Sequence, residues 1–173
     1  VVLAQIIGSK RLEMAQKAAT QVMVLTVLVA FVFVGIVLIF NQVILTALFG
    51  SVDADVMRAA RIYFIVSSLS YPFMAVYNSS AGLFRAMGNS RIPMMASMLL
   101  NLLSVFGIGL AIFGFKAGIT GVAIATLTAR ILAASFILKL NFNPDLIIQL
   151  DRQKLWIWNK ELILRILKVA LPN

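Results

Sequence analysis

The sequence contains neither cysteine nor histidine among its 173 residues. These absences exclude disulfide scaffolds, zinc sites, thiol nucleophiles and imidazole bases. Asp and Glu total only six, so paired-carboxylate chemistry has few candidates. The sequence also has no P-loop and no dinucleotide-binding glycine motif. It therefore predicts a protein that is not an enzyme, with no catalytic residues and no metal-ligating cluster.

Charged residues are scarce as well. They make up 12% of the chain, whereas a soluble domain carries about 25%. Hydrophobic residues reach 62%, and the mean hydropathy is +1.02. This composition excludes an ordinary globular domain and a disordered chain, and it predicts an all-α integral membrane protein.

The apolar residues form runs long enough to cross a bilayer. A helix needs roughly 20 residues to span a hydrocarbon core of about 30 Å. The gaps between charges predict complete spans at residues 18–40, 62–84 and 92–114, and residues 118–138, in which Arg130 is the only charge, make a fourth. Residues 1–7 are expected to be the end of a preceding span, and both ends of the chain suggest a fragment of a longer membrane protein.

The net charge of +9 comes from basic residues in the gaps between these runs rather than on one face. This distribution does not indicate nucleic-acid binding, and it sets the topology by the positive-inside rule. Eleven basic residues fall on one side: Lys10, Arg11, Lys17, Arg85, Arg91, Lys139, Arg152, Lys154, Lys160, Arg165 and Lys168. That side is predicted to be cytoplasmic, in a multi-pass protein of the cytoplasmic membrane.

The second span carries a polar helix face. Ser67, Tyr71, Met74 and Asn78 are spaced four, three and four residues apart, and Pro72 between them predicts a kink. Polar side chains of this kind either hydrogen-bond neighbouring helices or line a cavity. The pattern leaves both interpretations open for Tyr71 and Asn78.

The third span has Asn101 about 15 Å from Arg91, close to the expected midplane. Ser97 and Ser104 share its face. A bare amide in hydrocarbon costs several kcal/mol, so Asn101 must find a partner. Either it holds two helices together or it faces a cation or substrate.

The fourth span combines a stripe of small residues with an unusual charge. Small residues recur every four positions, a pattern typical of close helix packing: Gly121, Ala125, Ala129 and Ala133. Arg130 lies roughly 13 Å from the inner surface. It either extends to the interface and caps carbonyls or pairs with a carboxylate outside this sequence.

Three segments together resemble one family. Residues 71–94, YPFMAVYNSSAGLFRAMGNSRIPM, resemble the loop between helices four and five of multidrug and toxic compound extrusion (MATE) transporters. Residues 4–19 look like that family's connection between helices two and three, and residues 118–130 are similar to its sixth helix. The order and spacing also agree. The resemblance implies the end of helix two to the start of helix seven of a twelve-helix, two-lobe antiporter fold.

The resemblance also implies a function. The family exports drugs and organic cations in exchange for Na⁺ or H⁺, by alternating access around a central cavity. Carried over to this sequence, the cavity residues are Asn101, Thr126 and Asn78, with Na⁺ near Asn101 and Thr126, and the polar face of the second span adds Tyr71 as a cavity candidate. No other cofactor is expected, and the partners are the bilayer, small-molecule substrates and the carboxy-terminal lobe. Val105 stands where some members have an Asp, which leaves the position of the coupling carboxylate open.

Residues 1–140 are thus expected to be a partial amino-terminal transmembrane lobe. Residues 141–173 are expected to be an interfacial amphipathic linker leading into the next span. Two other functions stay open: a lipid-linked oligosaccharide flippase of related architecture, and a non-transporting membrane scaffold. Several arginines in the cavity would favour the flippase, whereas convergence of Asn78, Asn101 and Thr126 would argue against the scaffold.

Overall fold

A computed structural model describes residues 12–50, 52–143, 146 and 148 of the chain. Within these residues every regular element is helical, which confirms the predicted all-α class. Four segments of the described chain are long and apolar enough to cross a membrane. They comprise Ala15–Phe49, Ala54–Ala86, Arg91–Gly114 and Gly118–Asn141.

The first of these segments lies in α2, Leu12–Phe49, which is longer than the predicted span of 18–40. Asn41 does not end the helix, because its side chain is buried and its amide donates to the Leu38 carbonyl. The helix instead stops at Gly50, whose φ of 61° is a left-handed conformation that ends helices. At 38 residues the helix is about 57 Å long, so it must tilt or extend beyond the hydrocarbon core.

The second crossing is made by two helices in line, α3 (Ala54–Leu69) and α4 (Tyr71–Ala86). They meet at Ser70, two residues before Pro72. Proline has no N–H to donate to the Ser68 carbonyl, so the regular ladder is interrupted there. The Ser70 hydroxyl donates to the Ser67 carbonyl and the Ser70 carbonyl accepts from Met74 N–H, at 3.1 Å. The junction is therefore compact, and Ser70 is completely buried.

The third and fourth crossings form a helical hairpin. α5 (Arg91–Gly109) continues into η1 (Leu110–Gly114), a single stretch of π-helix in which Phe115 N–H bonds to the Leu110 carbonyl at 3.0 Å. A short turn then leads into α6 (Gly118–Asn141). The start of α5 is capped by Asn89, whose side-chain oxygen accepts from Arg91 N–H at 3.1 Å and Ile92 N–H at 3.3 Å.

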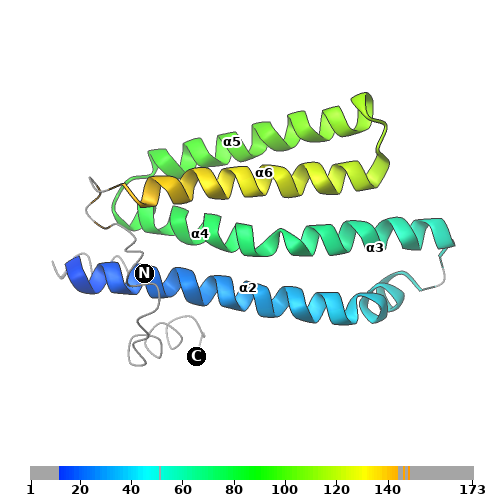
Figure 1. The fold of residues 1–173 in the computed structure, drawn as a ribbon, viewed down its shortest axis with the longest axis horizontal. Coiled ribbons are helices and arrows are strands. Elements are labelled where there is room, and N and C mark those ends of the chain that lie inside the picture. The colour runs from blue at the N-terminus through cyan, green and yellow to red at the C-terminus, as the bar shows by residue number, and fades with distance from the viewer. Residues whose placement is uncertain (1–11, 51, 144–145, 147, 149–173) are drawn as a thin grey trace.

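The crossings alternate in direction and lie side by side in the order α2, α3–α4, α6, α5 (Figure 1). α6 packs against α5 along most of its length and against α3 and α4 on another side. Because α6 has neighbours on two sides, it is the helix against which α4 and α5 are both positioned.

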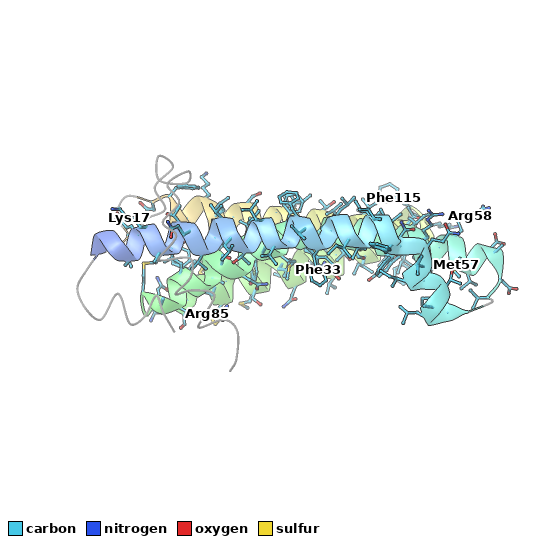
Figure 2. All side chains as sticks on the ribbon, turned by 90° about the horizontal axis from the view of Figure 1, so that it is seen from below. Lys17, Phe33, Met57, Arg58, Arg85 and Phe115 are labelled. Carbon is cyan, nitrogen blue, oxygen red and sulfur yellow. The ribbon has the colours of Figure 1, made fainter. Side chains whose placement is uncertain are left out.

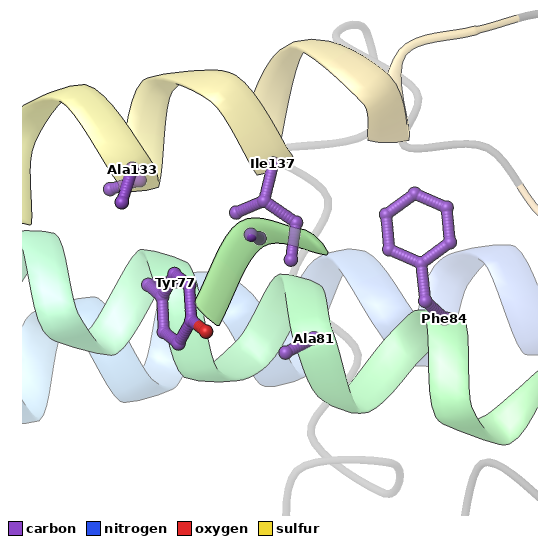
Figure 3. Packing of buried hydrophobic residues seen from close by; sticks show 7 residues of the cluster. Tyr77, Ala81, Phe84, Ala133 and Ile137 are labelled. Atoms are coloured by element: carbon purple, nitrogen blue, oxygen red, sulfur yellow. The ribbon is translucent and has the colours of Figure 1, made fainter. Parts of the chain in front are cut away.

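Small residues make these contacts possible. In the main buried cluster, Tyr77, Ala81 and Phe84 of α4 face Ala133 and Ile137 of α6 (Figure 3). The alanines leave room for the aromatic rings and let the two backbones approach. A second cluster joins α4 to α2, through Leu83 of α4 and residues Ala15, Ala19 and Met23 of α2.

Charge separates the two ends of the molecule. Lys17 and Arg85 lie at one end of the bundle, whereas Arg58 lies at the other (Figure 2). The fold thus brings together basic residues that the positive-inside rule assigns to one side. Residues 1–7 and almost all of the predicted linker 141–173 lie outside the described residues, so those two predictions stay predictions.

Candidate functional site

The polar face predicted on α4 lies at the surface of the described helices. Asn78 is exposed and Tyr71 is 44% exposed. Seven residues separate them, which is close to two helical turns, so they share one side of the helix. Tyr77 and Ala81, in contrast, are buried against α6. The side of α4 carrying Tyr71 and Asn78 is therefore less covered by the other described helices than the side carrying Tyr77 and Ala81.

Asn101 occupies the same kind of position on α5. Its side chain is exposed, whereas Ala96 of the same helix is completely buried. Val105, one turn further along, is 69% exposed. Within the described residues Asn101 and Asn78 make no side-chain hydrogen bond, so neither amide holds two of these helices together.

Thr126 has a different environment. It is half-buried on α6, and its hydroxyl donates to the Val122 carbonyl at 2.9 Å. This bond to the preceding turn is the usual way for a threonine to satisfy its donor inside an apolar helix. The lone pairs of the hydroxyl oxygen remain available to a cation or a substrate.

Arg130 has the contact that sequence reasoning missed. Its guanidinium donates to the Ser70 hydroxyl, at the junction of α3 and α4. No ion pair of Arg130 is found in the described part of the chain. Neither of the two interpretations of Arg130 included this serine. The Ser-Tyr-Pro sequence at 70–72 could have indicated this contact, because a serine beside a proline-interrupted helix is a suitable partner for a buried donor.

The predicted site residues thus fall on three helices, α4, α5 and α6. Among the described residues, no hydrogen bond or ion pair joins any two of Tyr71, Asn78, Asn101 and Thr126. The described residues also contain no cluster of acidic side chains that could hold a metal ion. The cavity roles of these four residues and the Na⁺ position near Asn101 and Thr126 stay predictions.

The four apolar helical spans run in alternating directions and carry polar side chains at membrane depth. These features define a class, namely polytopic helical membrane proteins. Comparison with known proteins identifies the family. The MatE family model matches residues 1–111, and the chain belongs to that family.

Solved structures agree with this assignment. The chain is similar to an inward-facing multidrug resistance MATE family transporter of the MOP superfamily (TM-score 0.87, 22% identity, 98% of this chain and 38% of that one). It is also similar to an outward-facing transporter of that description (TM-score 0.86, 20% identity, 96% and 36%). A third match is a MOP superfamily transporter from Pyrococcus furiosus whose binding pocket is described as having reverse polarity (TM-score 0.84, 22% identity, 98% and 37%). The chain spans 36–38% of the length of these proteins.

Proposed function

We propose that residues 1–173 form part of the amino-terminal lobe of a twelve-helix antiporter that exports drugs and organic cations from the cytoplasm. Uptake of Na⁺ or H⁺ drives the export, and the two lobes alternate access to a central cavity. The observation that carries the proposal is the exposure of Asn78 and Asn101 on two membrane-spanning helices, where neither side chain hydrogen-bonds to any other described residue.

The depth of these amides supports a cavity. Asn101 lies ten residues after the start of α5 and Asn78 eight residues before the end of α4. At 1.5 Å per residue both are about 12–15 Å from the basic end of the bundle. An amide facing lipid at that depth would cost several kcal/mol, so each must face water, a ligand or another part of the protein.

Helix geometry supports convergence of the polar residues. On both helices the asparagine is displaced in the same rotational sense from the side that packs on α6, by about 100° on α4 and about 120–140° on α5. The two helices run in opposite directions, so these displacements place Asn78 and Asn101 on the same side of α6. Thr126 projects from α6 toward that side, between them. Two amide oxygens and a hydroxyl oxygen are suitable ligands for Na⁺ or for an organic ammonium group.

The match to two access states supports a rocking motion. The fold of this chain fits an inward-facing and an outward-facing transporter almost equally well, with TM-scores of 0.87 and 0.86. A unit whose internal structure is similar in both states is suited to move as a rigid body. Net export then requires the ion and the drug to favour different access states.

The flippase alternative has less support. A polar, anionic lipid-linked cargo would require several arginines in the cavity. Among the four described spans, Arg130 is the arginine at membrane depth, and its guanidinium is already bonded to Ser70. The reverse polarity described for the Pyrococcus furiosus protein shows that this fold accepts cavities of different character, so cargo must be tested directly.

The test is Asn101→Ala in the full-length protein, with Leu102→Ala as the matched control. Leu102 is also exposed but faces another side of α5. Hydrogen bonds to charged groups are worth about 1.5–3 kcal/mol, so Asn101→Ala should slow organic-cation efflux by about tenfold or more at equal membrane abundance. Efflux driven by an imposed Na⁺ gradient and by an imposed pH gradient identifies the ion. Unchanged efflux in Asn101→Ala would remove this residue from the site.

The scaffold alternative is tested by the triple variant Asn78→Ala, Asn101→Ala and Thr126→Ala. Transport should be lost in the antiporter. Full transport by this variant would show that the three polar residues do not form the cavity, and absence of transport by the parent protein would favour the scaffold.

A further inference from the structure

A concavity lies between α5, η1 and α6. Its volume is about 490 Å³, and its lining is almost wholly apolar. Large hydrophobic side chains form its rim, among them Phe106, Leu110, Phe115 and Ile124. These four are 73%, 59%, 73% and 52% exposed, so the concavity is a groove that opens to the outside of the bundle.

The groove does not belong to the candidate transport site. On α5, Phe106 and Leu110 lie about 140–180° around the helix from Asn101. None of Tyr71, Asn78, Asn101 and Thr126 lines it. The groove and Asn101 therefore lie on opposite sides of α5.

Local sequence explains why the groove exists. The base is made of small residues, including Gly107, Ala111, Gly121 and Ala125. Gly107 and Ala125 are in such close contact that a Cβ on Gly107 would lie 3.2 Å from the Ala125 Cβ. The π-helix at η1 adds a residue to the last turn, which turns Leu110 outward while Ala111 stays buried. Tight packing at the base and bulky residues at the rim produce the open apolar groove.

Its dimensions suit one hydrocarbon chain. The α6 lining runs from Gly121 to Leu132, twelve residues that extend about 16 Å along the helix. Half of a bilayer's hydrocarbon core is about 15 Å thick. The one hydroxyl in the lining, on Thr128, donates to the Ile124 carbonyl at 2.8 Å, so no lining side chain requires a polar ligand.

Charge at the mouth favours an anionic head group. Lys116 is exposed and lies between Phe115 and Ala117, which both line the groove. Its φ of 51° belongs to the tight turn that joins η1 to α6, and Ala117 N–H closes this turn by bonding to the Ala111 carbonyl at 2.9 Å. The backbone of Lys116 thus lies at the end of the groove where α5 and α6 are joined, which is the end nearest a membrane surface and its lipid phosphates.

We infer that this groove binds one phospholipid of the leaflet next to Lys116, with an acyl chain along α5 and α6 and the anionic head group at Lys116. The inference is independent of the proposed transport function. It predicts a lipid that stays with the protein when the surrounding bilayer is removed.

The test uses the full-length protein in detergent, titrated with phosphatidylglycerol or phosphatidylcholine and analysed by native mass spectrometry. Thr128→Trp fills the groove from an exposed position. Ser135→Trp is the matched control, because Ser135 lies two turns further along the same face of α6, is exposed, and does not line the groove. Thr128→Trp should weaken retention of phosphatidylglycerol by about tenfold, and Ser135→Trp should leave it unchanged. Ile124→Trp gives a second test if Thr128→Trp folds poorly.

The head-group contact has its own control. Lys116→Gln should reduce the preference for phosphatidylglycerol over phosphatidylcholine, whereas Arg58→Gln, at the same end of the bundle, should not. Equal retention by Thr128→Trp, Ile124→Trp and the parent protein would overturn the inference. Equal loss in Thr128→Trp and Ser135→Trp would also overturn it, because the retained lipid would then be a general annular one. Finding another segment of the protein in the groove would have the same consequence.

Discussion

Gly121 allows a direct test of the helix packing that positions α6. A Cβ at this residue would lie 2.6 Å from the Ala117 Cβ and 3.0 Å from the Ala111 Cβ. Real Cβ atoms essentially never come closer than 3.0 Å. Both neighbours are attached directly to the backbone and cannot rotate away. Gly121→Ala must therefore shift α6 relative to the turn before it and to η1.

The expected magnitude follows from two opposing terms. Overpacking of a well-packed site costs about 1–3 kcal/mol. Replacing glycine by alanine within a helix gains roughly 0.5–1 kcal/mol. Gly121→Ala should thus lower the free energy of unfolding by up to about 2.5 kcal/mol.

The matched control is Gly82→Ala in α4, where a Cβ would meet nothing within 4 Å. Only the propensity gain applies there, so this variant should be as stable as the parent or more stable by roughly 0.5–1 kcal/mol. The assay is a reversible titration with sodium dodecyl sulfate in mixed micelles, followed by circular dichroism. If Gly121→Ala proved as stable as Gly82→Ala, the close approach of α6 to η1 would be refuted.

Two further predictions concern polar contacts. Ser70→Ala should lower the free energy of unfolding by about 1.5–3 kcal/mol, because it leaves the Arg130 guanidinium without its partner. A double-mutant cycle with Arg130→Gln should show coupling between the two residues, and additive effects would contradict the contact. Asn89→Ala should lower the free energy of unfolding by about 1 kcal/mol in the same titration, because it removes the cap of α5, and Asn89→Ser should keep most of that stability. An Asn89→Ala variant as stable as the parent protein would show that the cap is dispensable.

Much of the fold could be predicted from the spacing of charges. Uncharged runs of at least 20 residues leave little choice but membrane-spanning helices, and the runs ending at Arg85 and starting at Arg91 fix the turn between α4 and α5. The end of α2 could not be predicted in the same way. Asn41 interrupts an apolar run, but its amide bonds to its own helix, and only the φ of Gly50 shows where the helix stops.

The π-helix at Leu110–Gly114 was also beyond prediction, since no local residue pattern distinguishes it from the end of α5. It depends on packing against α6, where the lack of a side chain at Gly121 leaves room for Ala111. The stripe of small residues was interpreted as a packing surface. In the structure Gly121 and Ala125 pack α6 against η1 and α5, whereas Ala133 lies in the cluster with α4. Gly121, Ala125 and Ala129 also line the groove.

The candidate site was predictable only in part. Sequence spacing could place Asn78 and Asn101 near membrane depth, because depth depends on helix rise alone. Whether they face a neighbouring helix or an open side depends on which faces pack together, and that is a tertiary property. Arg130 illustrates the same limit, because its partner Ser70 is sixty residues away in the sequence.

The central claim is that the side of α5 carrying Asn101 borders a water-filled cavity. The most direct measurement is labelling of Asn101→Cys in the full-length protein by a charged, membrane-impermeant maleimide. Residues 1–173 contain no cysteine, so a single introduced thiol reports on its own position once any cysteines elsewhere have been replaced. Thiols react as thiolates, which form in water and not in hydrocarbon. Phe106→Cys, on the opposite side of α5 and 73% exposed in the isolated bundle, is the control. The account predicts rapid labelling at position 101 and slow labelling at position 106, whereas equal or absent labelling at both positions would contradict it.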